Sequence, residues 1–347
     1  MANGSWDPTA LPTSPGLYIN YVTAAAARIN GGARGTVAIP LLTYTGATAS
    51  TFYTVTTEKE ASDTFGAANI QSILFALQGG AKEVLVYTLP STPDAAAYTA
   101  MRTAFDTRPF NVFVLDGEFN VTQFAAIKTW VIANRAAGKH FMCVFGGDAA
   151  SDAVPATGNT RSILENDDYI VNATVGTKVG ATTYSSAQYA PYWAGLIAGT
   201  AINRSITYSR LPADDVNKRF TNAEVDTALA AGSLVSIHDG EKVKIVQGLT
   251  TAKTKIRSIR ARQAISTDIT KTAADSYIGK IDNNADGQAA LISAVKAYLE
   301  TLERANVLTG PAVILDPQHA STGDSVFLAI SYVEVDSMER IFLTINV

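Results

Sequence analysis

Short apolar stretches and longer amphipathic ones alternate along the first 200 or so residues of this chain. The short ones predict buried strands at Gly35–Leu42, Thr51–Thr56, Glu83–Leu89, Asn111–Asp116, His140–Phe145 and Tyr169–Val175. The longer ones have apolar positions at helical spacing and predict helices over residues 67–78, 94–105, 122–137 and 188–203. Apolar strands that alternate with helices are typical of a mainly parallel sheet covered on both faces, so the pattern predicts an α/β domain.

The pattern changes near Ser233. Two short strands, Leu234–His238 and Lys242–Val246, are separated by a polar turn and predict a hairpin. Residues 254–281 and the amphipathic stretch Gly287–Asn306 predict helices, and strands follow at 312–315 and 325–335. We therefore expect an α/β domain over residues 31–235 and an α+β domain over residues 236–335.

Both ends of the sequence predict strands that need a partner. Near the beginning, Leu17, Ile19 and Tyr21 alternate with Tyr18, Asn20 and Val22 after a polar leader. At the end, after Arg340, Ile341, Leu343 and Ile345 alternate with Phe342 and Thr344. An apolar strand edge that nothing covers invites pairing with another chain. We therefore expect residues 1–30 and 336–347 to be arms that donate strands to neighbouring subunits. The alternative is that the two strands pair within their own subunit.

Composition narrows the class of protein. The chain has 347 residues, of which 47% are hydrophobic and only 17% are charged. This charged fraction lies below the usual value of about a quarter, as expected of a surface that other copies of the chain cover. A net charge of −4 argues against a nucleic-acid binder.

The cellular compartment follows from what the sequence contains. Cys143 is the one cysteine, which excludes an internal disulfide and fits a reducing compartment. We expect no signal peptide, because the start has no basic region followed by an apolar core. No apolar run approaches the length that spans a membrane. We therefore expect assembly in the cytoplasm of the host, without direct membrane insertion.

An enzyme is the alternative function. Asp116 and Asp148 lie at the ends of two predicted parallel strands, where α/β enzymes bind nucleotides or small substrates. However, no glycine pattern of a dinucleotide or phosphate loop opens a helix, and no Ser/His/Asp set has a defensible arrangement. Turns are the favoured interpretation, and we predict no catalytic residue and no cofactor.

Metal sites are not predicted either. His140, His238 and His319 are far apart in the sequence and share no ligand spacing with Cys143. Residues 282–288 resemble the start of a calcium loop, but Ser293 stands where that loop needs a bidentate Glu. A helix N-cap before Gly287 is the favoured interpretation.

Four segments together resemble the tail sheath protein of contractile phage tails. They are Leu11–Asn20, Tyr189–Gly199, Tyr277–Asn284 and Val335–Val347. The resemblance extends from end to end and is closest to the compact sheath of phage-like particles and contractile bacteriocins of Gram-positive bacteria. It implies terminal arms that weave neighbouring subunits into a mesh. It also implies a helical stack of rings that contracts around a tail tube, with baseplate and tail terminator proteins as further partners, in a released virion or phage-tail-like particle.

Residues 242–262 form a basic stretch, which is either a solvated face or a weak nucleic-acid patch, weak because it lacks aromatic residues. The resemblance gives a third interpretation. It implies that the inner, C-terminal domain holds the tube through complementary charge. The candidate tube-facing residues are Lys253, Lys255, Arg257, Arg260, Lys296 and Arg304. The hinges for contraction would be residues 23–35, with Gly31 and Gly32, and the pair Asp336 and Ser337. Whether the particle is a phage or a bacteriocin stays open.

Overall fold

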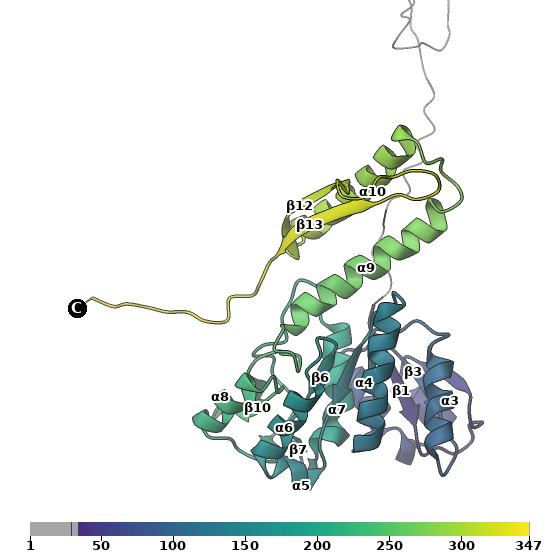
Figure 1. Cartoon of the computed structure of the whole chain (residues 1–347). Coiled ribbons are helices and arrows are strands. Elements are labelled where there is room, and N and C mark those ends of the chain that lie inside the picture. Colours follow the sequence, from purple (N-terminus) through teal and green to yellow (C-terminus); the bar gives the residue numbers. More distant parts are fainter. Residues whose placement is uncertain (1–28, 30–33, 347) are drawn as a thin grey trace, which may run out of the picture.

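The computed structural model describes residue 29 and residues 34–346. Its larger part is built on a six-stranded sheet of order β2-β3-β1-β4-β5-β6 (Figure 1). Five strands run parallel: β1 (Thr36–Leu41), β3 (Glu83–Thr88), β4 (Val112–Val114), β5 (Met142–Phe145) and β6 (Ile170–Asn172). The edge strand β2 (Phe52–Val55) pairs antiparallel with β3. The predicted, mainly parallel sheet is therefore confirmed.

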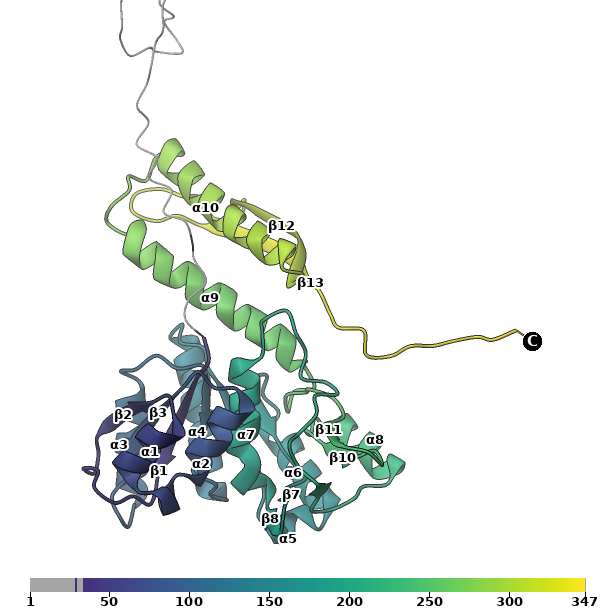
Figure 2. The same ribbon diagram turned by 180° about the vertical axis from the view of Figure 1, so that it is seen from behind.

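Helices cover both faces of this sheet (Figures 1 and 2). On the face seen in Figure 1 lie α3 (Ala95–Phe105) and α4 (Val121–Ala136). On the face seen in Figure 2 lie α1 (Glu58–Phe65), α2 (Gln71–Gly79) and α7 (Ser186–Gly199), and a 3-10 turn (Ala67–Asn69) precedes α2. The side chain of Asp94 caps α3 by accepting the backbone N–H of Ala97, which places the helix start where the sequence predicts it.

One helix has an inverted distribution of polar and apolar side chains. α6 (Pro155–Glu165) follows the short α5 (Ala149–Asp152) and buries Asn159, Arg161 and Ser162. Its apolar residues Ile163 and Leu164 are 64% and 68% exposed. The sequence does not predict α6, because pattern reasoning assigns apolar residues to the buried side of a helix.

Smaller elements complete the body, which we define as residues 34–255. β7 (Thr177–Val179), β8 (Thr182–Tyr184) and β9 (Asp215–Val216) form a three-stranded sheet, and α8 (Asn222–Ala230) follows. The predicted hairpin is confirmed as β10 (Ser236–His238) and β11 (Val243–Ile245). Val243 and Ile245 belong to the larger hydrophobic core. Because this hairpin packs in the larger core, we propose that the body extends past the boundary expected near residue 235 to the start of the next helix.

The C-terminal unit, residues 256–335, has its own small core. It consists of α9 (Ile256–Ser276), α10 (Ala285–Arg304), β12 (Leu308–Leu315) and β13 (Leu328–Glu334). α9 leads from the body to the far end of this unit, and α10 packs on the hairpin that β12 and β13 form (Figure 1). The predicted N-cap before Gly287 is confirmed, since the side chain of Asn284 accepts the backbone N–H of Gly287. Among the helices of the described residues, none combines the length and apolar character needed to cross a membrane.

Candidate functional site

The arm, residues 336–346, leaves the C-terminal unit and extends away from it (Figure 1). It forms no strand within the described part of the single chain. Ile341, Phe342, Leu343 and Ile345 are between 67% and 90% exposed. Burying apolar side chains is favourable, and a contiguous run of exposed ones marks a site of interaction with a partner. The strand predicted over residues 340–345 is therefore not formed among the described residues, and its pairing with another chain stays a prediction. The N-terminal strand over residues 17–22 lies outside the described residues.

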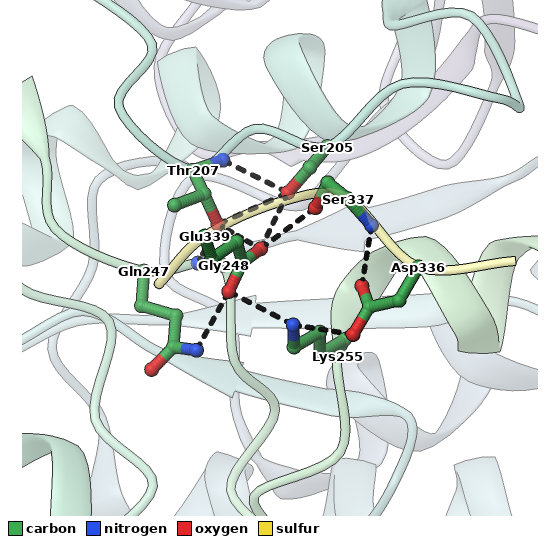
Figure 3. Close-up of polar contacts among 8 residues, drawn as sticks. All are labelled: Ser205, Thr207, Gln247, Gly248, Lys255, Asp336, Ser337 and Glu339. Carbon is green, nitrogen blue, oxygen red and sulfur yellow. Dashed lines mark hydrogen bonds and ion pairs between the residues drawn. The ribbon is translucent and has the colours of Figure 1, made fainter. Parts of the chain in front are cut away.

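The arm is fastened to the body at its root before it extends outward (Figure 3). Glu339 is the main contact: its Oε1 accepts from the hydroxyl of Thr207 at 2.9 Å and that of Ser337 at 2.9 Å. Its Oε2 accepts from Gln247 at 2.8 Å and forms an ion pair of 2.9 Å with Lys255 Nζ. The Glu339 side chain is only 7% exposed. We call this arrangement of Glu339 and its donors the latch.

Electrostatics hold the latch carboxylate in its charged form. Burial alone would raise the pKa of Glu339, but the hydrogen bonds from Lys255, Gln247, Thr207 and Ser337 outweigh it and lower the pKa to about 2. Burial alone would likewise lower the pKa of Lys255, but its hydrogen bonds with Asp336 and Glu339 outweigh it and raise the pKa. The Lys255–Asp336 distance is 2.5 Å. Both partners therefore stay ionised at neutral pH.

The latch bears on one of the predicted hinges. Asp336 binds Lys255, and Ser337 donates its hydroxyl to Glu339 (Figure 3). This pair is thus held on the body, and we revise the proposal that it is a hinge. The other predicted hinge, residues 23–35 with Gly31 and Gly32, lies outside the described residues apart from positions 29, 34 and 35.

In the part of the basic stretch that lies on α9, the arginines form hydrogen bonds and ion pairs within the subunit instead of facing a tube. Arg257 donates to the carbonyl of Asn306 at 2.8 Å, and Arg260 donates to the carbonyl of Thr200 at the end of α7. Arg262 forms an ion pair with Glu334 at the end of β13. Arg257 and Arg260 are each only 8% exposed and donate to carbonyls of their own subunit, so we withdraw both as tube contacts.

The other four residues predicted to face a tube lie in two different places. Lys255 is engaged in the latch, and Lys253 lines the cleft beside it, which α8 and the arm root border. Lys296 and Arg304 are exposed on α10, well separated in sequence from the latch. The structure therefore brings together Lys253 and Lys255, and it leaves Lys296 and Arg304 as charges open to a partner.

The β12–β13 hairpin has two outer edges that differ. Val335 donates its N–H to Val307 and Asp316 donates to Phe327, which close the two ends of the ladder. Because amides alternate along a strand, the N–H of Ile330 on β13 points away from β12. The outer edge of β12 is interrupted by a bulge between Thr309 and Ala312, which contains Pro311. Prolines and bulges block strand pairing, so β13 offers the better acceptor edge.

A second exposed apolar surface lies on the body. Lys128 of α4 donates to the carbonyl of Leu164 at 2.8 Å and so joins α4 to α6. Ile132 on α4 and Ile163 and Leu164 on α6 are 42%, 64% and 68% exposed. We call these three residues the apolar face. Isolated exposed apolar residues are ordinary, but a helix that buries its polar side and exposes its apolar side indicates a partner.

The acidic residues of the alternative enzyme site have structural roles. Asp116 is buried, where it accepts from the hydroxyl of Ser72 and from the backbone of Leu42, and burial raises its pKa. Asp148 caps α5 by accepting the N–H of Ser151 at 2.8 Å. No cluster of three metal-ligating side chains is found in residue 29 and residues 34–346. The enzyme alternative is thus not supported.

Sequence reasoning did not find the latch, and little in the sequence could have revealed it. The sequence places Glu339 only within the arm over residues 336–347, yet its donors come from positions 205, 207, 247, 255 and 337. The usable signal is that the strand pattern begins after Glu339, so that Asp336 and Glu339 are acidic residues directly before an apolar segment.

Two family models match the chain. The model of the phage tail sheath protein central domain matches residues 91–251, and that of the phage tail sheath C-terminal domain matches residues 250–347. A curated relative, the tail sheath protein of Clostridium phage phiCD119, is 25% identical over 220 residues. That match covers 53% of this chain and 61% of the relative, so it spans less than two thirds of the relative's length.

Solved structures share the fold over nearly the whole chain. The sheath tail protein of Desulfitobacterium hafniense has a TM-score of 0.73 and 17% identity, covering 92% of this chain and 100% of that one. The sheath tail protein of Listeria innocua has a TM-score of 0.68 and 17% identity, covering 90% and 98%. The helical sheath of the anti-feeding prophage in its contracted state has a TM-score of 0.74 and 15% identity, covering 97% and 99%.

Proposed function

The chain belongs to the phage tail sheath protein family, and from this premise we propose that it is the repeating subunit of a sheath that polymerises around a tail tube and contracts. Its copies would assemble in the bacterial host and form a helical stack of rings. Contraction, triggered at a baseplate, would drive the tube through the envelope of a target cell. A tail terminator protein would close the other end of the stack.

The observation that carries this proposal is that one chain has both an exposed apolar arm and a strand edge that is free to pair. The arm exposes Ile341, Phe342 and Leu343 without a strand partner, and β13 has an outer edge without a neighbour in the described residues. Adding the arm of one copy to β13 of the next would satisfy both. Each backbone hydrogen bond contributes only about 0.5–1.5 kcal/mol net, but several bonds together with buried Ile and Leu side chains make a firm tether.

The work of contraction requires no cofactor in this proposal. Subunits would assemble in an extended, metastable packing and then move as nearly rigid bodies into a packing of lower free energy. The body supplies the surfaces that change contacts, and the apolar face on α4 and α6 is the surface we assign to this role. The donated strands keep neighbours connected while the bodies move.

Contact with the tube would come from the C-terminal unit. Lys296 and Arg304 are the exposed cations on α10 that we propose for this contact, through charge complementarity with an acidic tube surface. The choice between a phage and a bacteriocin does not depend on these residues.

The test compares the full-length chain with a chain that ends at Arg340, which keeps Glu339 and its donors. Negative-stain electron microscopy of both purified proteins should show rings or hollow cylinders for the full-length chain and only small particles for the shortened one. Small, uniform particles in both samples would count against polymerisation through the arm. Cylinders in both samples would show that another surface drives assembly.

A further inference from the structure

We propose that Glu339 is a positioning residue: it fixes the root of the C-terminal arm to the body of its own subunit, so that the donated strand starts at Arg340. The joint that moves during contraction then lies after Glu339 rather than at Asp336 and Ser337. The first part concerns the single subunit, whereas the second rests on the proposed function.

The number and kind of donors indicate that the Glu339 carboxylate is bound at a specific site. An ionised carboxylate offers about four lone-pair positions, and Glu339 receives Lys255, Gln247, Thr207 and Ser337 on two oxygens. A fifth donor, the hydroxyl of Ser205, lies at 3.3 Å. Charged hydrogen bonds are stronger than neutral ones, and a glutamine in this position could accept on only one of its two terminal atoms.

The donors themselves are held in place. Gly248 donates its backbone N–H to the hydroxyl of Thr207 at 3.0 Å, and Thr207 donates its backbone N–H to the hydroxyl of Ser205 at 3.1 Å (Figure 3). Thr207 therefore presents its hydroxyl to Glu339 from a loop that is already fixed. This pre-existing order reduces the entropy lost when the arm root binds.

The place of the latch in the chain gives it a mechanical consequence. Lys255 directly precedes α9, and Glu339 follows β13, so the two residues mark the beginning and end of the C-terminal unit. Their ion pair closes the chain of this unit into a loop on the body. Tension on the arm therefore reaches the body through Glu339 instead of peeling β13 from β12.

The same geometry fixes the point from which the donated strand starts. The root of the arm, from Ser337 to Arg340, lines the cleft beside α8, so the chain leaves the body from this place. A strand that begins at a fixed point has fewer orientations to lose when it pairs, which raises its effective concentration at the neighbouring edge.

Limited trypsin digestion of the unassembled subunit tests the latch directly. Arg340 provides a cleavage position immediately after Glu339, and mass spectrometry follows release of the peptide 341–347. The variants are Glu339→Gln and Glu339→Ala, and each rate is divided by that of the free peptide 336–347 with the same residue, because an acidic residue beside Arg340 itself slows trypsin. The matched control is Glu300→Gln, which removes an exposed charge on α10. Low protein concentration keeps the samples monomeric, as sedimentation velocity verifies.

Release of the peptide should be about tenfold faster or more in both Glu339 variants than in the wild type, because charged hydrogen bonds that hold the root are lost. Thermal unfolding should show that the body stays folded in these variants. Equal cleavage in wild type, control and both variants would overturn the latch. Faster cleavage at every site, together with loss of the folded body, would show a general structural role and would also overturn it.

A second measurement separates the latch from the proposed function. Glu339→Gln at assembly concentration should give fewer or shorter polymers than Glu300→Gln, by electron microscopy. Faster cleavage with normal polymers would leave the latch in the free subunit but overturn its positioning role in donation. Failure of the wild type itself to polymerise would count against the proposed function while the digestion result still decides the latch.

Discussion

Gly195 of α7 faces the carbonyl oxygen of Ala76 in α2 so closely that a Cβ added to Gly195 would lie 2.0 Å from that oxygen. The same contact recurs a turn later, where a Cβ on Gly199 would lie 2.0 Å from the carbonyl oxygen of Gly80. The two helices therefore touch backbone to backbone on one face of the sheet. The segment Tyr189–Gly199, one of those that carry the family resemblance, has a physical reason for its two glycines.

Replacement of Gly195 by alanine should destabilise the body. The added methyl group must push α7 away from α2, and overpacking of this kind costs about 1–3 kcal/mol. Urea unfolding followed by circular dichroism measures the change. Ala125→Ser, which adds one atom on an exposed part of α4, serves as the control and should leave the unfolding midpoint nearly unchanged. A Gly195→Ala protein as stable as the wild type would contradict the tight contact.

Apolar periodicity predicted the parallel sheet because its strands are buried on both faces, so that side-chain character alone identifies them. It failed at α6, where Asn159, Arg161 and Ser162 face inward and Ile163 and Leu164 face outward. The apolar pattern of a helix identifies its buried side only if that side packs within the same subunit. An exposed apolar helix face is what remains when the partner is another molecule.

The charged residues show a second limit of prediction from the sequence. Arg257 and Arg260 look like surface cations because the sequence does not reveal that their partners are the carbonyls of Asn306 and Thr200. A guanidinium can satisfy distant carbonyls in a buried place, whereas the sequence records only its charge. Glu339 is the acidic counterpart, since its donors are spread over three separate segments of the chain.

Removing Arg260 should loosen the junction between α9 and the body. Its guanidinium caps the carbonyl end of α7 at Thr200, and burial lowers its pKa to about 10, so it remains charged at neutral pH. Arg260→Ala leaves buried carbonyls without a donor, which should lower the free energy of unfolding by about 1–3 kcal/mol. Calorimetry measures this, with Arg304→Ala on exposed α10 as the control. An equal decrease in the free energy of unfolding for the two variants would contradict a role of Arg260 in joining α9 to the body.

Blocking the outer edge of β13 should prevent assembly without unfolding the subunit. The N–H of Ile330 points away from β12, so Ile330→Pro removes a donor for an incoming strand and no ladder bond to β12. We expect a folded monomer by circular dichroism and few or no polymers by electron microscopy. Ile330→Val keeps the N–H and the apolar character and should polymerise. Normal polymers from the folded proline variant would place the acceptor edge elsewhere.

The contribution of Glu339 to stability should depend on pH in one direction. The folded-state pKa is lowered to about 2, below the ordinary value of 4.5, so the charged form stabilises the fold above pH 4.5. This contribution falls as the pH drops from there through the folded-state pKa. The unfolding free energies of wild type and Glu339→Gln should differ by about 1–3 kcal/mol at pH 6 and by less at pH 3. A difference that grows toward acid would have the wrong sign.

The apolar face on α4 and α6 should matter only between subunits. Ile163→Asp places a charge where the side chain is 64% exposed, so the monomer loses little and should unfold within about 0.5 kcal/mol of the wild type. In a lattice where a neighbour covers this face, the same charge must be desolvated, and packing there is disfavoured. Electron microscopy should then show polymers that are fewer or arrested in one state, as donated strands still connect the subunits. Thr160→Asp, at another exposed position of α6, introduces the same charge just outside the face as we define it. If both variants assemble and contract like the wild type, α4 and α6 face solvent in the sheath, and another surface of the body must carry the contacts that change.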